Sequence, residues 1–320
     1  MSGVTKSNIM KSIRIHAYGG TEVMVYEDAP RPTPARGDVL VRVHAAGVNP
    51  VDWKVREGRL QGRVNHRLPL ILGWDVAGVV EELGVGVTHI KVGDAVYARP
   101  DIARDGAYAE YIAVRAAELA LKPRSLDFIH AAAVPLAALT AWQSLFDAAG
   151  LRAGQSVLIH AGAGGVGHFA VQLARWRGAR VVATASKSNA EFLRGLGADE
   201  VIDYHDTPFE DAVTDMDVVL DTQGGAIYER SWRVLKKGGI IVSLINQPSA
   251  ELAEQYGAHA AYVFVQPNAE QLTQIAGLID GGIVKPVVET VFPLAEARQA
   301  HALIQAGHTR GKIVLRVTEA

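Results

Sequence analysis

Hydrophobic and polar positions change their spacing twice along the chain. Up to about residue 125, short apolar or alternating runs such as SIRIHAY, VLVRVHAAGV and DVAGVVEELG are separated by Gly, Asp and Pro clusters, which predicts a β-rich region. From about Asp127 the segment FIHAAAVPLAALTAWQSLFDAAG is alanine-rich and has a helical period. Strand-like and helical stretches alternate after it, and this alternation predicts a parallel sheet with helices on both faces.

The strand candidates of the alternating region are short apolar runs, and helical stretches such as GHFAVQLARWRG and AEFLRGLG lie between them. They are residues 156–161, 180–185, 200–204, 216–222, 239–245 and 259–265.

The end of the chain again has the strand-like pattern of the first region. The runs GGIVKPVVETVFPL and GKIVLRV lie on either side of the helical stretch AEARQAHALIQAG. We therefore predict that residues 1–124 and 269–320 form one β-rich domain and that residues 125–268 form an inserted domain. The predicted fold class is α/β, with a doubly wound parallel sheet of the Rossmann type in the inserted domain.

Composition narrows the class of protein. The chain has 320 residues, 49% of them hydrophobic, and 32 basic against 34 acidic side chains give a formal net charge of -2. This balance gives no electrostatic reason to expect nucleic acid or a membrane as a partner. The stretch MSGVTKSNIM has no apolar core of a secretory signal, and the chain has no cysteine. We therefore expect a cytoplasmic protein without disulfides, thiolate zinc sites or cysteine nucleophiles.

The glycine cluster in LIHAGAGGVGHFAVQLA follows a strand candidate and opens a helix candidate. This context is that of the dinucleotide-binding turn. Gly162 would allow the tight turn, Gly164 the approach of backbone to a pyrophosphate, and Gly167 the close packing of helix on strand. Gly165 and Val166 lie between them, at the helix N-terminus that would face the phosphates.

The end of the next strand indicates which dinucleotide binds. An NAD site usually has an Asp or Glu there for the ribose 2′-hydroxyl, but VVATASKSN has no acid before Glu191. Ser186 and Lys187 instead offer a hydroxyl and a cation for a 2′-phosphate. Tyr204, at the end of the following strand, could flank that phosphate or the adenine. We therefore expect NADPH as the cofactor.

Several motifs together resemble the medium-chain dehydrogenase/reductase superfamily, and within it the zinc-independent quinone oxidoreductase and enone reductase branch. They are AAGVNPVDWKVREG, LGWDVAGVVEELGVGV, VGDAVYA, GAYAEY, PLAALTAWQSL, GAGGVG and GKIVL. The resemblance covers residues 11–318 and implies a GroES-like catalytic domain for the β-rich part of the chain.

The resemblance also bears on metal binding. Zinc alcohol dehydrogenases of the superfamily use a Cys, a His followed by Glu, and a second Cys. The matching positions here hold Asn49, the pair Trp74 and Asp75, and Leu136, from which no tetrahedral zinc site can be assembled. The four-cysteine loop is replaced by a short segment between Asp94 and Gly106, so we expect no metal.

A zinc-free member of this branch is expected to reduce quinones or α,β-unsaturated carbonyls, because hydride adds directly to the conjugated carbon. Asn49 could bind the substrate oxygen or the nicotinamide ribose, or could simply form a turn before Pro50. Lys54 could donate to a developing enolate or lie in solvent. Asp52 is expected in a structural ion pair, and Trp74 as a possible wall of the substrate cleft. Arg56, Arg59, Arg63, His66 and Arg67 are expected to form a basic loop, which is either solvated or faces an anionic substrate or a cofactor phosphate.

The remaining site residues are implied by the resemblance alone. Thr140 resembles a family residue that faces the nicotinamide. Backbone at Leu244–Ile245 and Phe264–Val265 would hold the carboxamide, and Lys312 would lie near the cofactor. A homodimer formed edge to edge through residues 260–265 is also implied.

Two alternatives remain open at this point. The chain could be an enone or alkenal reductase with negligible quinone activity, since that class shares every motif above. It could also be a non-catalytic NADPH-binding protein.

Overall fold

The structure, a computed structural model, describes residues 8–307 and 309–318. The chain divides into two compact units: unit 1 consists of residues 1–136, 266–280 and 286–320, and unit 2 of residues 137–265 and 281–285. The domain limits expected from the sequence, at residues 124 and 269, stay a prediction.

Unit 1 is β-rich, as its strand-like runs predicted. A three-stranded sheet has the order β2-β1-β4, and a seven-stranded sheet has the order β15-β16-β3-β5-β6-β8, with β7 paired to β3. The strands are β1 (Ile9–Ile15), β2 (Met24–Pro30), β3 (Asp38–Val48), β4 (Leu70–Ile71), β5 (Val76–Leu83), β6 (Ala95–Ala98), β7 (Tyr111–Arg115), β8 (Leu119–Leu121), β15 (Val288–Pro293) and β16 (Lys312–Arg316). The helices are α1 (Pro50–Arg56), α2 (Phe128–Ala132), α9 (Ala269–Asp280) and α10 (Ala297–Ala306).

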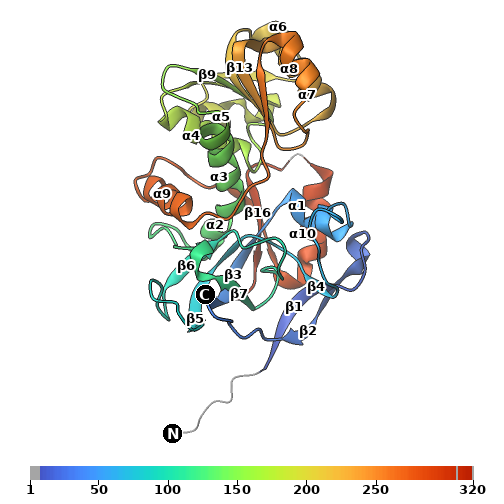
Figure 1. Ribbon diagram of the computed structural model, residues 1–320, viewed down its shortest axis with the longest axis vertical. Coiled ribbons are helices and arrows are strands. Elements are labelled where there is room, and N and C mark those ends of the chain that lie inside the picture. Colours follow the sequence, from blue (N-terminus) through green and yellow to red (C-terminus); the bar gives the residue numbers. More distant parts are fainter. Residues whose placement is uncertain (1–7, 308, 319–320) are drawn as a thin grey trace. The chain divides into compact units, whose positions relative to one another are not determined.

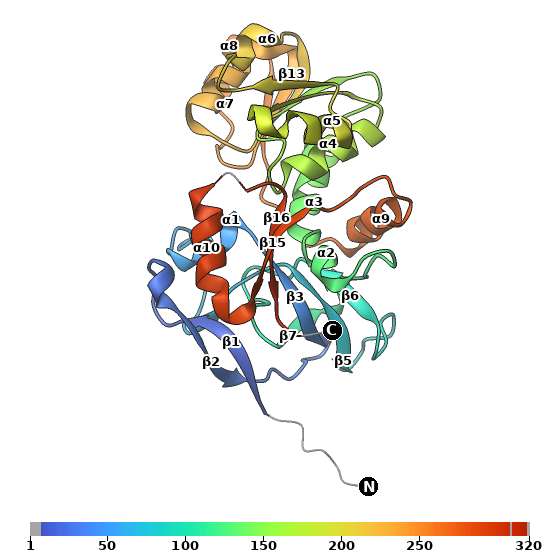
Figure 2. The same ribbon diagram turned by 180° about the vertical axis from the view of Figure 1, so that it is seen from behind.

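Strand β3 organises unit 1. It pairs antiparallel with β5, β7 and β16, and all of its residues except Arg42 are buried. This burial explains why VLVRVHAAGV reads as a nearly continuous apolar run rather than a strict alternation. Segments far apart in the sequence thus meet in one sheet, with α10 beside β16 (Figure 2).

Unit 2 has the predicted doubly wound sheet. Its six strands are all parallel, in the order β11-β10-β9-β12-β13-β14, and Figures 1 and 2 show α4 and α5 on one side of the sheet and α7 and α8 on the other. The strands are β9 (Ser156–Ile159), β10 (Arg180–Ala185), β11 (Glu200–Asp203), β12 (Met216–Asp221), β13 (Leu235–Ser243) and β14 (His259–Tyr262). The helices are α3 (Pro135–Trp142), α4 (Gly167–Trp176), α5 (Ala190–Leu196), α6 (Phe209–Ala212), α7 (Gly225–Ser231) and α8 (Ala250–Tyr256).

All six strands predicted for unit 2 are present, and five of them end before the predicted limit. The run at residues 259–265 forms a strand only as far as Tyr262. Its partner β13 ends at Ser243, which pairs with Tyr262, so the ladder ends there. The sheet order changes direction between β9 and β12, and ligands of doubly wound sheets bind at this point.

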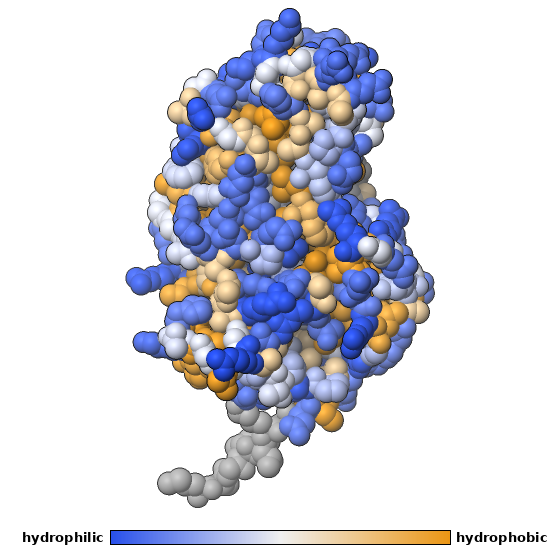
Figure 3. All heavy atoms as spheres, in the orientation of Figure 1, coloured by the Kyte–Doolittle hydropathy of each residue, from blue (hydrophilic) through white to orange (hydrophobic). Residues whose placement is uncertain are grey.

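No helix among residues 8–307 and 309–318 is long and apolar enough to cross a membrane. On the face drawn in Figure 3, hydrophilic residues alternate with smaller hydrophobic patches.

Candidate functional site

Three polar residues predicted or noted from the motifs meet at one edge of the larger sheet of unit 1. Asn49 follows β3, Asp75 precedes β5, and Lys312 is the first residue of β16. The pairing of Ile313 with Val48 and of Ala46 with Val76 brings these strand ends together. All three side chains are buried, with 2%, 0% and 3% exposure respectively.

The amide of Asn49 is held from both sides. Its Nδ2 donates to Asp75 Oδ2 at 2.7 Å, and its Oδ1 accepts a hydrogen bond from Lys312 Nζ. Lys312 Nζ also lies 3.2 Å from Asp75 Oδ2, and Asp75 Oδ1 accepts from the backbone N–H of Leu136 at 2.6 Å. Since an amide nitrogen carries two hydrogens, Asn49 keeps one N–H with a fixed direction.

Among the described residues, Asp52 has no ion pair, contrary to the expectation from the sequence. It lies at the third position of α1, where its Oδ2 accepts from Asn49 N–H at 2.8 Å and from the Tyr108 hydroxyl at 2.8 Å. The first contact is one half of a capping box, and it fixes the backbone at Asn49. Complete burial raises the pKa of Asp52 to about 7, with the hydrogen bond from Asn49 as the main opposing influence.

A chain of hydrogen bonds leads from Arg56 to Asp52, and each group in it donates to the next. His301 Nδ1 lies 3.0 Å from Arg56 Nη1, and because arginine only donates, Nδ1 must accept and Nε2 carries the proton. That nitrogen donates to the Tyr108 hydroxyl at 3.4 Å, and Tyr108 donates to Asp52. Burial, with a smaller effect of Arg56, lowers the pKa of His301 to about 3, so the imidazole is neutral.

Arg56 is therefore not part of a solvated basic loop. It is the last residue of α1, is 1% exposed, and donates to Gly19 O at 3.1 Å as well as to His301 and Glu57. The apolar face of the helix carries it inward, together with Val55. Arg59, by contrast, is exposed and lies over the Trp53 ring with its Cζ 4.7 Å from the centroid.

Lys54 lies in α1 and is half-buried, with its Nζ 5.7 Å from the centre of the Trp53 ring. Burial, helped by the nearby Arg59, lowers the pKa of Lys54. Its predicted role as a donor stays a prediction.

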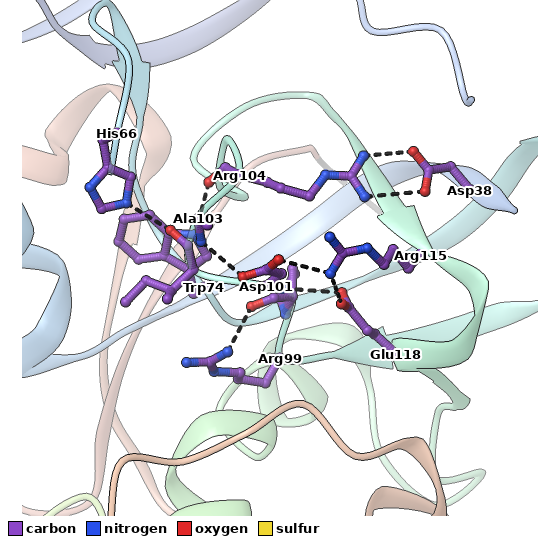
Figure 4. Close-up of polar contacts among 11 residues, drawn as sticks. Asp38, His66, Trp74, Arg99, Asp101, Ala103, Arg104, Arg115 and Glu118 are labelled. Atoms are coloured by element: carbon purple, nitrogen blue, oxygen red, sulfur yellow. Dashed lines mark hydrogen bonds and ion pairs between the residues drawn. The ribbon is translucent and has the colours of Figure 1, made fainter. Parts of the chain in front are cut away.

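The short segment that replaces the four-cysteine loop is held by side chains (Figure 4). Arg104 forms a double hydrogen bond with Asp38 at 3.1 and 2.6 Å, and Asp101 pairs with Arg115 at 2.8 Å. Trp74 Nε1 donates to Arg104 O at 3.1 Å. Trp74 is wholly buried, so its indole acts here as a support for the segment.

The predicted nucleotide residues lie in unit 2, where the glycine loop joins β9 to α4. A side chain at Gly167 would place its Cβ 2.3 Å from Ala161 O, and one at Gly162 would meet Ala183 Cβ at 2.8 Å. At Gly164 the nearest atom is Ala161 O at 3.3 Å, and nothing else lies within 4 Å. Gly162 and Gly167 are therefore required by packing, while Gly164 leaves an open approach to backbone.

Within the described part of the chain, the N–H groups of Gly165 and Val166 have no hydrogen-bond partner. They precede the ten-residue helix α4, whose N-terminus favours negative charge. Open backbone at Gly164 and free N–H groups beside it fit the pyrophosphate of a dinucleotide.

Ser186, Lys187 and Tyr204 are brought together at neighbouring strand ends, because Ala185 of β10 pairs with Asp203 of β11. Lys187 and Tyr204 are exposed, and Ser186 Oγ is bonded to Ser188 Oγ at 3.1 Å and to Asn189 Nδ2 at 3.0 Å. A hydroxyl and the ammonium group of an exposed lysine at this point can receive a phosphate.

The other predicted cofactor residues, except Lys312, also belong to unit 2. Thr140 lies in α3 and is 5% exposed, and Leu244 directly follows β13 with its N–H bonded to Asp221 O at 3.0 Å. Phe264 and Val265 lie beyond the end of β14. Asn49, Lys54 and Lys312 belong to unit 1.

Within residues 8–307 and 309–318, no group of three or more His, Asp or Glu side chains could hold a metal ion. The place where Asn49 and Asp75 meet is occupied by the ammonium group of Lys312.

Sequence reasoning missed the polar residues that support Asn49. Tyr108 and His301 come from segments 193 residues apart, and each looks like an ordinary core residue in its own segment. The motif GAYAEY was a signal for Tyr108, but no local pattern marks its partners.

Two family models match the chain: the alcohol dehydrogenase GroES-like domain over residues 35–124, and the zinc-binding dehydrogenase family over residues 196–315. Among curated proteins the chain is 33% identical to a mitochondrial NAD(P)H oxidoreductase of Danio rerio, covering 98% of this chain and 93% of that protein. It is 36% identical to a chloroplastic NADPH-dependent alkenal/one oxidoreductase of Arabidopsis thaliana, over 96% and 79% of the two chains. Among solved structures it resembles the quinone oxidoreductase from Coxiella burnetii, with a TM-score of 0.89, 38% identity, and coverage of 97% and 100%.

Proposed function

Because the chain belongs to the medium-chain dehydrogenase/reductase superfamily and is an oxidoreductase that uses a nicotinamide cofactor, we propose that it reduces quinones or α,β-unsaturated carbonyls with NADPH. The observation that carries this proposal is the buried edge in unit 1, where Asn49 is fixed by Asp75 and Lys312. An oriented amide N–H beside a buried ammonium is suited to a carbonyl oxygen that gains negative charge.

The bound nicotinamide would supply the hydride. The free N–H of Asn49 donates to the carbonyl oxygen of the substrate, and Lys312 lowers the energy of negative charge on that oxygen. Asp75 keeps both groups in place, and it pairs with the Lys312 charge so that the edge is not strongly cationic. Since these donors are fixed before the reaction, little reorganisation is needed during it.

The nucleotide residues of unit 2 fit the cofactor. Gly162, Gly164, Gly165, Val166 and Gly167 would hold the pyrophosphate by backbone, for the packing reasons given above. Ser186, Lys187 and Tyr204 would hold the 2′-phosphate that distinguishes NADPH from NADH. Thr140, Leu244, Phe264 and Val265 would contact the nicotinamide end, and Lys312 would lie near it.

The test is NADPH oxidation by purified protein against a benzoquinone and a short enone, with NADH in parallel. Asn49→Ala should lower kcat by about 10²–10³-fold, the cost of removing one oxyanion donor, while the Kd for NADPH stays within twofold. Asn268→Ala, which removes an amide that caps α9, is the matched control and should leave kcat unchanged.

Other outcomes decide between the alternatives. Turnover of the enone alone would make the protein an enone reductase with negligible quinone activity. Tight NADPH binding without turnover of either acceptor would identify a non-catalytic NADPH-binding protein and contradict the proposal. A stronger response to NADH than to NADPH would contradict the role of Lys187.

Two further expectations belong to this proposal. We propose that two copies pair through β14, which is an edge strand of the unit 2 sheet. Sedimentation velocity at micromolar concentration should show a dimer, and a monomer would contradict this.

We also propose a cytoplasmic location. The two curated relatives named above are mitochondrial and chloroplastic. Fractionation of cells tests the location.

A further inference from the structure

Arg99 is a buried cation that has no ion pair among the described residues. It follows β6 directly, is 2% exposed, and donates through Nη1 to Pro100 O at 3.2 Å. Its Nε is buried without a partner, and its Nη2 has none within the described chain. Figure 4 shows the guanidinium turned away from Arg115 and Glu118.

Three carboxylates near Arg99 are already paired with other cations. Asp101 and Glu118 lie 2.8 and 3.0 Å from Arg115 Nη1. Asp75 is paired with Lys312 at 3.2 Å. None of these carboxylates forms a hydrogen bond or ion pair with the Arg99 guanidinium among the described residues, and burying a cation without a direct partner costs folding free energy.

The strand register places Arg99 at the edge that holds Asn49. Val76 of β5 pairs antiparallel with Ala98 of β6, so the next position along puts Asp75 opposite Arg99. Residues opposite each other at this spacing are direct neighbours. Arg99 thus joins Asn49, Asp75 and Lys312, the group that we assign to the substrate carbonyl.

We propose that Arg99 binds a carboxylate of the substrate, so that the preferred acceptors are conjugated carbonyl compounds that carry a carboxylate. This rests on the proposed function. Nε and Nη2 form one side of the guanidinium fork, and both are free to pair with the two oxygens of a carboxylate. The bound carboxylate would supply the directly bonded partner that Nε and Nη2 lack among the described residues.

The test compares two acceptors with the same conjugated skeleton, trans-4-oxopent-2-enoate and its methyl ester. The wild-type KM should be at least tenfold lower for the acid than for the ester. In Arg99→Gln the ratio of the KM for the ester to the KM for the acid should fall toward one, because the KM for the acid rises. Arg99→Lys should give an intermediate KM ratio, because lysine keeps the charge but lacks the guanidinium fork. Arg104→Gln, on the same segment but paired with Asp38, should leave the ratio at the wild-type value.

Different failures have different meanings. A wild-type ratio near one overturns the role of Arg99, although turnover of the ester would still support the proposed reductase. A loss of kcat for acid and ester alike in Arg99→Gln would overturn it as well, because the anion would then be the reacting oxygen rather than a substrate carboxylate.

A binding measurement keeps the proposal testable without turnover. In the presence of NADPH, 4-oxopentanoate should raise the Tm of the wild type more than its methyl ester does, and this difference should vanish in Arg99→Gln. If Arg99→Gln does not fold, Arg99→Lys replaces it in both measurements. Equal responses to acid and ester in the folded proteins would overturn the proposal even if no acceptor were reduced.

Discussion

The polar edge of unit 1 is built from side chains, whereas the glycine loop of unit 2 is built from backbone. The glycine loop consists of backbone and a few small residues that are consecutive in the sequence, and its selectivity comes from the absence of side chains. The edge of unit 1 consists of buried charged and amide side chains from separate strands, with Asn49 and Lys312 263 residues apart. A site built from backbone tolerates little added volume, whereas a site built from charges tolerates little change in charge.

The largest expected effect is the loss of stability when the cation at the edge of unit 1 is removed. Lys312→Met leaves Asp75 buried without its partner, and breaking a buried pair costs about 3–5 kcal/mol of unfolding free energy. Adding Asp75→Asn to Lys312→Met should recover part of this loss. Chemical denaturation measures both variants, and a single-variant loss below about 1 kcal/mol would contradict a charge-sensitive edge.

A second test uses pH. Because burial raises the folded-state pKa of Asp52 to about 7, the folded protein binds a proton that the unfolded chain releases near its lower pKa. This contribution to stability is complete below the unfolded pKa and is lost as pH rises through about 7. From about pH 5 to 8 the wild type should lose on the order of 2 kcal/mol relative to Asp52→Asn.

The comparison with Asp52→Asn removes the histidine contributions, which have the opposite sign. The pKa values of His160 and His301 are lowered by burial, so their contributions are lost as pH falls. Thermal unfolding of both proteins across this range checks the prediction, and parallel curves would contradict it.

Added volume is the matching test in unit 2. Gly167→Ala would bring its Cβ 2.3 Å from Ala161 O and should cost about 1–3 kcal/mol, as overpacking does. Gly195→Ala, in α5 with nothing within 4 Å, is the control and should not destabilise. Gly164→Ala should leave Tm nearly unchanged but weaken NADPH binding. Calorimetry measures the stability of these variants, and an equal loss of stability in Gly167→Ala and Gly195→Ala would contradict the contrast.

The smallest expected effect is at the proposed 2′-phosphate site. Lys187→Ala should raise the Kd for NADPH about tenfold, which corresponds to ~1.4 kcal/mol, and leave the Kd for NADH unchanged. Lys237→Ala, an exposed lysine after the start of β13, is the control. Equal changes for both cofactors would show that Lys187 does not distinguish them.

The same contrast explains what could be predicted from the sequence. The parallel sheet of unit 2 and its glycine turn were predictable because each strand, turn and helix has its own local pattern. The motifs also identified Asn49 and Lys312. The sequence could not show that Asp52 accepts from Tyr108 or that Arg56 turns inward to His301, because these contacts depend on how α1, α10 and the segment before β7 pack. The helices α1 and α9 were missed because they are flanked by strands in a β-rich region.

The position of β16 has a consequence for the order of folding. This strand lies between β15 and β3 in the sheet, although the ribosome makes it after all of the six strands of unit 2. Unit 2 is built almost entirely from one continuous stretch, so its pairings can form while the rest of the chain is still being synthesised. The large sheet of unit 1 cannot be completed until β16 has been made. Until then β3 lacks β16 as its neighbour, and Asp75 lacks the Lys312 cation. The unit that is begun first is therefore completed last.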